Sequence, residues 1–332
     1  MEKVLLLLLL SLASSPSVFS FNVPAIFTFG DSIFDAGNNH FLKNCTAQAD
    51  FPPYGSSFFH HPTGRFTNGR TVADFISQFI GLDLQKPYLQ AQIEVVNGTQ
   101  KNYPSNGINF ASAGSGVLRE TNKDMGVIPI QDQLQQFQTL VQQNQIDSKL
   151  VQQSLFFLES GSNDVFNYFL PFVTPTLDPD AYMQVMLTEV VHYLDTIYKL
   201  GARRIAVFAL GPVDVFQPGP SCLDIPIKYP GAVGIYGAVY DIVQRLRAIP
   251  KHYGFSDVSN ACCGDGILRG MLQCGQEGYK ICPNPYEYLF WDYFHPSEHT
   301  YKLISKGLWG GKQSQVRPIN LRTLANLTLS SV

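Results

Sequence analysis

The chain has 332 residues, of which 45% are hydrophobic and 15% charged, and its net charge is −3 at pH 7. A chain of this length and apolar content can bury a large core. Because the charge is nearly neutral and no basic stripe or nucleic-acid motif occurs, we expect no nucleic-acid partner.

The N-terminus has the pattern of a secretory signal. Lys3 precedes an apolar run over residues 4–10, and small residues then suit signal-peptidase cleavage after Ser20. The run is shorter than the roughly 20 apolar residues that span a bilayer, although an uncleaved anchor is the alternative. We expect residues 1–20 to be a cleaved signal peptide, and residues 21–332 to be a single secreted domain with no integral membrane span.

The cysteines fit an oxidising compartment. Six follow the signal: Cys45, Cys222, Cys262, Cys263, Cys274 and Cys282. No C-x-x-C pair occurs, which disfavours a zinc ribbon, and the sequence cannot choose among the possible pairings. A bond between the neighbours Cys262 and Cys263 would be strained, so each should pair within the 262–282 loop or beyond it. N-glycosylation sequons at Asn44, Asn97 and Asn326 also fit a secreted protein.

In chain order, the first elements alternate between strand and helix. Residues 25–32 are an apolar run that ends in Gly-Asp-Ser, and residues 68–81 place apolar side chains on one helical face and stop at Gly81. Two further apolar runs, residues 106–116 and 154–164, predict strands that end in small and polar residues.

Residues 131–145 are rich in glutamine. Leu134, Phe137 and Val141 keep helical spacing, so we predict an amphipathic helix whose amides form a solvated face.

Residues 178–201 are the clearest helix in the sequence. Asp178 is a good N-cap with Pro179 at the first helical position, and Gly201 is a good residue just past the end.

The second half of the chain continues the alternation. Residues 203–212 and 232–236 predict a fourth and a fifth strand, residues 237–247 predict a helix, and a last helix starts near Pro296. Apolar strands separated by amphipathic helices indicate an α/β fold with a parallel sheet covered on both faces.

The reactive groups of such folds gather at the carboxyl ends of the strands. Here those ends carry Ser32, the Ala113-Gly114 turn and Asn163. Each alone is an ordinary cap or turn residue. Together they could supply a nucleophile and oxyanion donors: the hydroxyl and N–H of Ser32, a main-chain N–H of the turn and the amide of Asn163.

The stretch "WDYFHPSEH" (residues 291–299) allows two interpretations. It spells H-x-x-E-H, a zinc-protease pattern, and also Asp292-x-x-His295, the acid and base of a serine hydrolase. A zinc site needs both histidines inside one helix, but Pro296 disfavours a helical conformation at the residue before it. We therefore expect His295 on a loop, Pro296 near the first helical position, and neither a metal nor a cofactor.

Several blocks carry a family resemblance. They occur in order over residues 25–300: "FTFGDSIFDAGNN", "TGRFTNGRT", "INFASAGSG", "ESGSND", "LGARRIAVFALGP", "NACCG" and "FWDYFHPSEH". No G-x-S-x-G elbow occurs, which disfavours the common α/β-hydrolase arrangement. The ordered set resembles the GDSL esterase/lipase family of the SGNH hydrolases, in its plant secreted branch.

The resemblance implies a three-layer α/β/α, flavodoxin-like fold with about five parallel strands. It implies that Ser32 is the nucleophile, that Asp292 and His295 complete the triad, and that Asn163 is an oxyanion donor. The family commonly has Gly-Gly where this chain has Ala113-Gly114. A backbone angle that only glycine tolerates would favour Gly114 as the donor.

One segment departs from the family. Residues 211–231 contain five prolines, so no ordinary helix fits there. The crossover helix between the fourth and fifth strands is apparently missing, and its loss would expose apolar surface. The alternative to a secreted esterase or lipase is therefore a catalytically inactive secreted protein of the same family.

The expected partners are ester substrates. Acyl lipids, cutin-like polyesters and acetylated polysaccharides all suit this chemistry, and the sequence does not choose among them. Phe58, Phe59, Phe166, Tyr168 and Phe169 could line an apolar groove or be ordinary packing. We expect a monomer.

Overall fold

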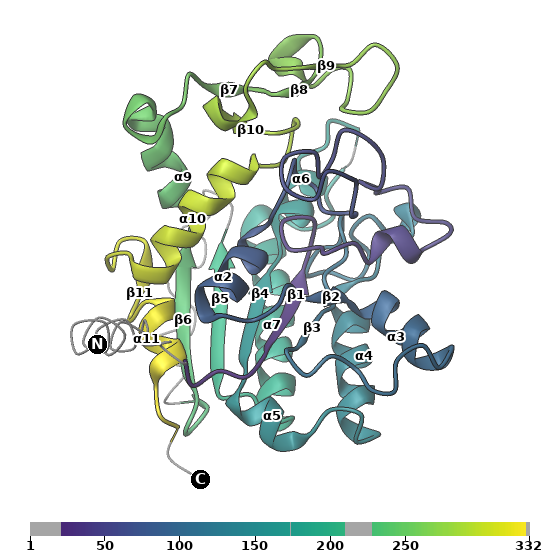
Figure 1. Ribbon diagram of the computed structural model, residues 1–332, viewed down its shortest axis with the longest axis vertical. Coiled ribbons are helices and arrows are strands. Elements are labelled where there is room, and N and C mark those ends of the chain that lie inside the picture. Colours follow the sequence, from purple (N-terminus) through teal and green to yellow (C-terminus); the bar gives the residue numbers. More distant parts are fainter. Residues whose placement is uncertain (1–20, 173, 210–227, 330–332) are drawn as a thin grey trace, which may run out of the picture.

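The computed structural model describes residues 21–172, 174–209 and 228–329 (Figure 1). Within these ranges a seven-stranded sheet forms the middle layer, in the order β11-β6-β5-β4-β1-β3-β2. Its strands are β1 (Ile26–Gly30), β2 (Lys86–Pro87), β3 (Ile108–Asn109), β4 (Leu155–Glu159), β5 (Arg204–Ala209), β6 (Val233–Ala238) and β11 (Val316–Arg317). All neighbours pair in parallel except β11 with β6.

The prediction of an α/β fold with a mostly parallel sheet is confirmed. The five predicted strands correspond to β1, β3, β4, β5 and β6. The prediction missed the two edge strands, β2 and β11, because neither lies in an apolar run: each is two residues long and contains a charged side chain.

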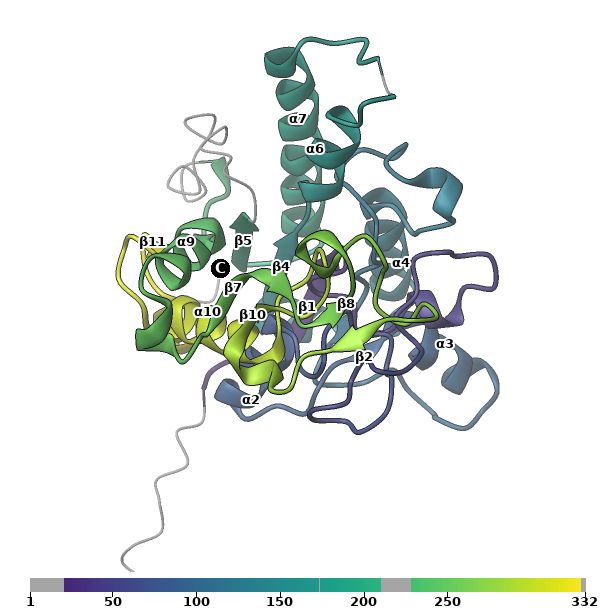
Figure 2. The same cartoon turned by 90° about the horizontal axis from the view of Figure 1, so that it is seen from above.

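Helices cover both faces of the sheet. The helices of the described chain are α2 (Val72–Ile80), α3 (Tyr88–Val96), α4 (Ile130–Gln142), α5 (Ser148–Gln153), α6 (Ser162–Tyr168), α7 (Pro179–Lys199), α9 (Val239–Ala248), α10 (Glu298–Gly310) and α11 (Leu321–Asn326). One core packs α4 and α7 against the sheet, and a second packs α2, α9, α10 and α11 against the opposite face. Figure 2 shows α7 on one side of the strands, with α2 and α10 on the other. Alternate side chains of β1 enter the two cores, so the strand is fully buried.

The predicted helix ends agree with the structure in two helices. Gly81 ends α2 in a left-handed conformation, with φ 90°. Asp178 caps α7 by accepting a hydrogen bond from the Ala181 N–H at 2.9 Å, and Pro179 occupies the first position. These ends follow from local sequence because a cap needs only its nearest neighbours.

Two helix predictions need correction. Ser297, not His295 or Pro296, is the N-cap of α10, so Pro296 lies before the helix instead of at its first position. In α4 the amide of Gln133 is fully buried instead of solvated, and it bonds both the N–H and the C=O of Gly30. A glutamine can face the core here because the end of β1 gives its amide both a donor and an acceptor.

A small layer lies above the carboxyl edge of the sheet (Figure 1). It holds β7 (Asp257–Ala261) paired with β10 (Tyr288–Phe290), β8 (Cys263–Gly264) paired with β9 (Lys280–Ile281), and short 3-10 helices at Pro250–Tyr253, Ile267–Arg269 and Pro285–Glu287. Two further 3-10 helices, Asn39–Phe41 and Lys123–Met125, lie in the first half of the chain.

Two disulfides hold this layer together. They join Cys262 to Cys282 and Cys263 to Cys274, so the neighbouring cysteines pair within the 262–282 loop as predicted. Cys45 is buried and bonds to no described cysteine.

Three predictions fall wholly or partly outside the described residues. They concern the signal peptide (residues 1–20), Cys222, and most of the segment 211–231, where the structure omits 210–227. Among the residues that are described, no helix combines the length and apolarity needed to cross a membrane.

Candidate active site

The three predicted strand-end segments meet at the carboxyl edge of the sheet. Ser32 follows β1, Gly114 lies in the turn after β3, and Asn163 is in the first turn of α6 after β4. Hydrogen bonds tie them together. The Asn163 side-chain amide donates to the Ser115 carbonyl at 2.9 Å and to Asp31 Oδ2 at 3.2 Å.

His295 and Asp292 form a close buried pair. Nδ1 of the imidazole lies 2.7 Å from Oδ1 and 2.8 Å from Oδ2 of the carboxylate. Asp292 also accepts the backbone N–H groups of Phe294 and His295, both at 2.8 Å. Burial opposes ionisation of Asp292, but the interaction with His295 and the donors around the carboxylate hold its pKa below the ordinary value.

Tyr54 completes the surroundings of the carboxylate. Its hydroxyl donates to Asp292 Oδ2 at 2.8 Å, across 238 positions of sequence. Burial, the negative charge of Asp292 and this hydrogen bond raise the pKa of Tyr54 well above its ordinary value, so the phenol remains a donor. The buried carboxylate of Asp292 thus accepts hydrogen bonds from four donors: the Tyr54 hydroxyl, two main-chain N–H groups and the imidazole of His295.

The segment "TGRFTNGRT" holds the His295 loop from the other side. The Phe66 ring lies 5.0 Å from the imidazole, and the Thr67 hydroxyl donates to the Pro296 carbonyl at 3.0 Å. Asn68 Oδ1 accepts the first N–H of α10, that of Glu298, at 2.8 Å. This block therefore fixes the position of the imidazole relative to the sheet.

Contacts link the His295 loop to the strand ends. The Phe166 ring of α6 lies 6.2 Å from the Phe294 ring. His295 also interacts electrostatically with Asp31, the residue next to Ser32. No hydrogen bond joins the Ser32 hydroxyl to the imidazole, both of which lie in the described chain. Hydrogen bonds of this kind are often long before a substrate binds.

The main-chain N–H groups of Ser32 and Gly114 are unused at this edge. Within the residues that the structure describes, the N–H groups of Ser32 and Gly114 donate no hydrogen bond. Their neighbours differ: the Ile33 N–H donates to Asp31 and the Ala113 N–H donates to Asp35 Oδ2 at 2.9 Å. Gly114 also has φ +83°, which a side chain at this position would disfavour. The geometry therefore favours Gly114 over Ala113 as a donor to a bound anion.

A buried pair of carboxyl groups, Asp31 and Glu159, lies next to Ser32 in the sequence or the sheet. Burial raises the pKa of Asp31 to about 6, although Glu159, the Ile33 N–H and His295 act to lower it. Burial and the negative charge of Asp31 raise the pKa of Glu159 well above its ordinary value. The two raised pKa values favour a proton on this pair, with Glu159 as the donor and Asp31 as the acceptor.

The side chains of the H-x-x-E-H pattern have separate partners. His295 bonds Asp292, Arg70 Nε donates to Glu298 Oε1 at 2.7 Å, and His299 Nε2 bonds the Tyr253 carbonyl at 2.8 Å. No cluster of three or more His, Cys, Asp or Glu side chains with metal-binding geometry occurs in the described ranges. The pattern therefore reflects a loop followed by a helix, as the proline predicted.

Sequence reasoning missed three side chains of the site. Tyr54 lies far from Asp292 along the chain and had no local signal. Asp35 lies in the block "FTFGDSIFDAGNN", but nothing in the sequence showed that it accepts the N–H groups of Gly37, Asn38 and Ala113. Glu159 reads as the last residue of a strand, and only the packing of the sheet brings it beside Asp31.

Comparisons with known proteins point to one family. A family model described as GDSL-like Lipase/Acylhydrolase matches residues 26–308. Two similar curated proteins come from Arabidopsis thaliana. GDSL esterase/lipase 6 is 62% identical and the match covers 96% of each chain; GDSL esterase/lipase At4g16230 is 33% identical, with 93% of each covered. The first match runs over 350 residues, more than the 332 of this chain, so part of that relative has no counterpart here.

Proposed function

Because the chain belongs to the GDSL-like lipase/acylhydrolase family, we propose that it is a serine hydrolase that cleaves carboxylic esters through an acyl-enzyme on Ser32. The observation that supports the proposal is the buried Asp292–His295 pair, whose imidazole interacts electrostatically with Asp31, the residue before Ser32.

The proposed first step is attack by the Ser32 hydroxyl on the ester carbonyl. Nε2 of His295 takes the serine proton, while Asp292 holds Nδ1–H and stabilises the imidazolium that forms. The proton then passes from Nε2 to the leaving alcohol, and the acyl group stays on Ser32. A water molecule, deprotonated by His295, releases the acid and regenerates the serine.

The oxyanion of each tetrahedral intermediate needs donors. The unused N–H groups of Ser32 and Gly114 can supply two. The Asn163 amide can supply a third if it gives up its longer bond, the 3.2 Å contact with Asp31. The proton shared by Asp31 and Glu159 reduces the negative charge on Asp31 and so makes that exchange easier.

The proposal includes secretion as a single domain. Residues 1–20 have the signal pattern, residues 21–332 would form the mature domain, and two disulfides fit an oxidising compartment.

An apolar rim beside the imidazole supports substrates with an apolar part. The rings of Phe166 and Phe294 are half exposed and pack edge to face, and the Phe294 ring lies 6.1 Å from the imidazole of His295. We therefore include acyl lipids and cutin-like polyesters as substrate classes and give acetylated polysaccharides less weight.

A series of p-nitrophenyl esters of rising chain length tests the proposal. We expect hydrolysis that increases from the acetyl ester to medium-chain esters and that disappears in Ser32→Ala. Equal rates in the Ser32→Ala variant would refute the proposal.

The second candidate is an inactive secreted member of the family. It is supported by the relative's extra residues and by the proline-rich segment 211–231. A chain that melts cooperatively and hydrolyses no ester would establish it.

A further inference from the structure

A pocket lies at the edge of the sheet opposite the one that carries Ser32. Its volume is about 1030 Å³, near the upper limit of common ligand sites. Residues 21–24 before β1, the end of α2, the start of β5 and the C-terminal segment after α11 line it. No residue of the candidate active site takes part.

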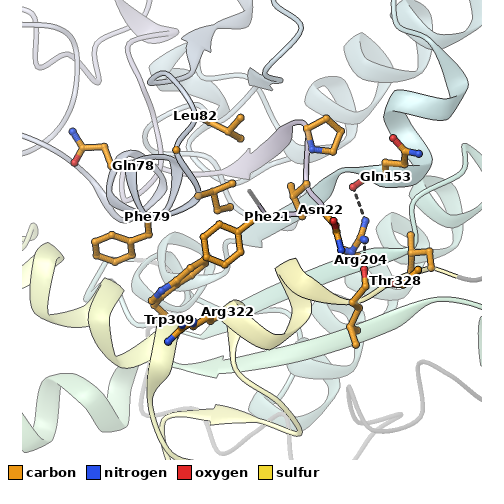
Figure 3. Close-up of a pocket in the computed structure, with 16 residues that line it drawn as sticks. Phe21, Asn22, Gln78, Phe79, Leu82, Gln153, Arg204, Trp309, Arg322 and Thr328 are labelled. Atoms are coloured by element: carbon orange, nitrogen blue, oxygen red, sulfur yellow. Dashed lines mark hydrogen bonds between the residues drawn. The ribbon is translucent and has the colours of Figure 1, made fainter. Parts of the chain in front are cut away.

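The polar part of the pocket is a buried arginine. Arg204 is 2% exposed, and its guanidinium donates to the backbone carbonyls of Gln153 and Leu327 (Figure 3). Its Nε has no hydrogen-bond partner. No described carboxylate forms an ion pair with it, and burial alone lowers its pKa. Since arginine stays protonated in proteins, Arg204 gives the pocket a positive charge that no described carboxylate neutralises.

The rest of the pocket wall matches an apolar chain. Phe21, Phe79, Leu82 and Trp309 form one side, and in Figure 3 Phe21 lies between Trp309 and Arg204. The rings of Phe21 and Trp309 pack at 5.0 Å. None of the sixteen lining residues is acidic, and the second charged one, Arg322, is also a cation.

We propose that this pocket binds a long-chain carboxylate, with the carboxylate on Arg204 and the alkyl chain running along Phe21 toward Trp309. Arg204 lines the pocket although little of its surface is exposed, so its guanidinium can donate a charge-assisted hydrogen bond to a carboxylate there. One buried cation matches one anionic group, and the apolar wall removes the alkyl chain from water. This pocket shares no residue with the candidate active site, so the proposal does not depend on the proposed function.

Quenching of tryptophan fluorescence by 12-bromododecanoate tests the proposal. Trp309 lines the pocket, and Trp291, the other tryptophan, is fully buried near the opposite edge. We expect saturable quenching in the full-length secreted protein and its loss in Trp309→Phe. Quenching that persists in Trp309→Phe would place the probe elsewhere and overturn the proposal.

Two comparisons test the role of the charge. Uncharged 12-bromododecanol should bind the unmodified protein about tenfold more weakly, because it forgoes a charge-assisted hydrogen bond. Arg204→Gln should weaken binding of the carboxylate by a similar factor and leave binding of the alcohol unchanged. Arg247→Gln, at an exposed position outside the pocket, is the control and should change neither. Equal binding of the two probes, a comparison that needs no variant, would overturn the assignment.

Discussion

Nδ1 of His295 lies within 2.8 Å of both carboxylate oxygens of Asp292, and the two groups are only three residues apart. The same carboxylate accepts the main-chain N–H of His295, so a single side chain fixes both the backbone and the ring of that residue. This arrangement leaves Nε2 as the nitrogen that can accept a proton.

Replacing Asp292 with asparagine should lower kcat by about 10³–10⁴-fold, because an amide no longer holds Nδ1–H or stabilises the imidazolium.

Asp292 should also stabilise the fold in a pH-dependent way, because its pKa is lower in the folded chain than in the unfolded chain. Its contribution to the free energy of unfolding is complete above the unfolded pKa near 4 and is lost as the pH falls below it. Steady-state kinetics and urea unfolding at pH 3–7 measure both effects. An Asp292→Asn variant with unchanged kcat would contradict the assigned role.

Tyr54→Phe should reduce kcat about tenfold, because Asp292 loses a hydrogen bond worth about 1.5–3 kcal/mol when the acceptor is charged. Part of this loss should appear as lower stability. Tyr198→Phe, which removes an exposed hydroxyl bonded to the Pro230 carbonyl, is the matched control. Steady-state kinetics and thermal melting of both variants measure the two effects. If the two variants behave alike, Tyr54 does not support the pair.

Gly114→Ala should reduce kcat by about 10–100-fold with a smaller change in KM. The added Cβ is strained at φ +83° and would lie 3.1 Å from Val127 Cγ1, so the main-chain N–H should shift away from the oxyanion. Ala113→Gly is the control, because the Ala113 N–H is already bonded to Asp35. The prediction fails if the control loses as much activity as Gly114→Ala.

Glu159→Gln should change the pH dependence of stability. Burial raises the pKa of Asp31 to about 6 and that of Glu159 further above its ordinary value, so the folded chain holds protons that the unfolded chain releases. The free energy of unfolding of the unmodified protein should therefore fall as the pH rises from about 4 through 6. The glutamine can donate to Asp31 without ionising.

Urea unfolding at pH 5, 6.5 and 8 measures this effect. Glu159→Gln should flatten the curve and gain about 1–3 kcal/mol at pH 8 relative to the unmodified chain. Glu277→Gln, at an exposed position, should change nothing. A Glu159→Gln variant that is less stable at all three pH values would show that ionisation of the pair does not lower the free energy of unfolding.

The sequence predicted those parts of the structure that depend on neighbouring residues. Strands β1, β3, β4, β5 and β6, the cap at Asp178 and the stop at Gly81 follow from local spacing and local backbone preferences. The order of reactive residues at the strand ends followed because parallel strands bring their carboxyl ends to one edge.

Other features depend on contacts that no periodicity reveals. The Tyr54–Asp292 hydrogen bond joins distant loops, and the burial of Gln133 depends on the open main-chain groups of Gly30. The carboxyl groups of Asp31 and Glu159 are neighbours because β1 and β4 pair in register, with Gly30 opposite Glu159. Such pairings are set by the packed sheet and cannot be predicted from either segment alone.

The reactivity of Ser32 is the most direct test of the account. The protein would be treated with a fluorophosphonate, and its intact mass and peptides would be measured by mass spectrometry, with circular dichroism melting as the test of folding. We expect one adduct per chain, located on Ser32, that is absent in Ser32→Ala and much slower to form in Asp292→Asn. A cooperatively folded protein that takes no label, or takes it at another residue, would contradict the proposed serine hydrolase.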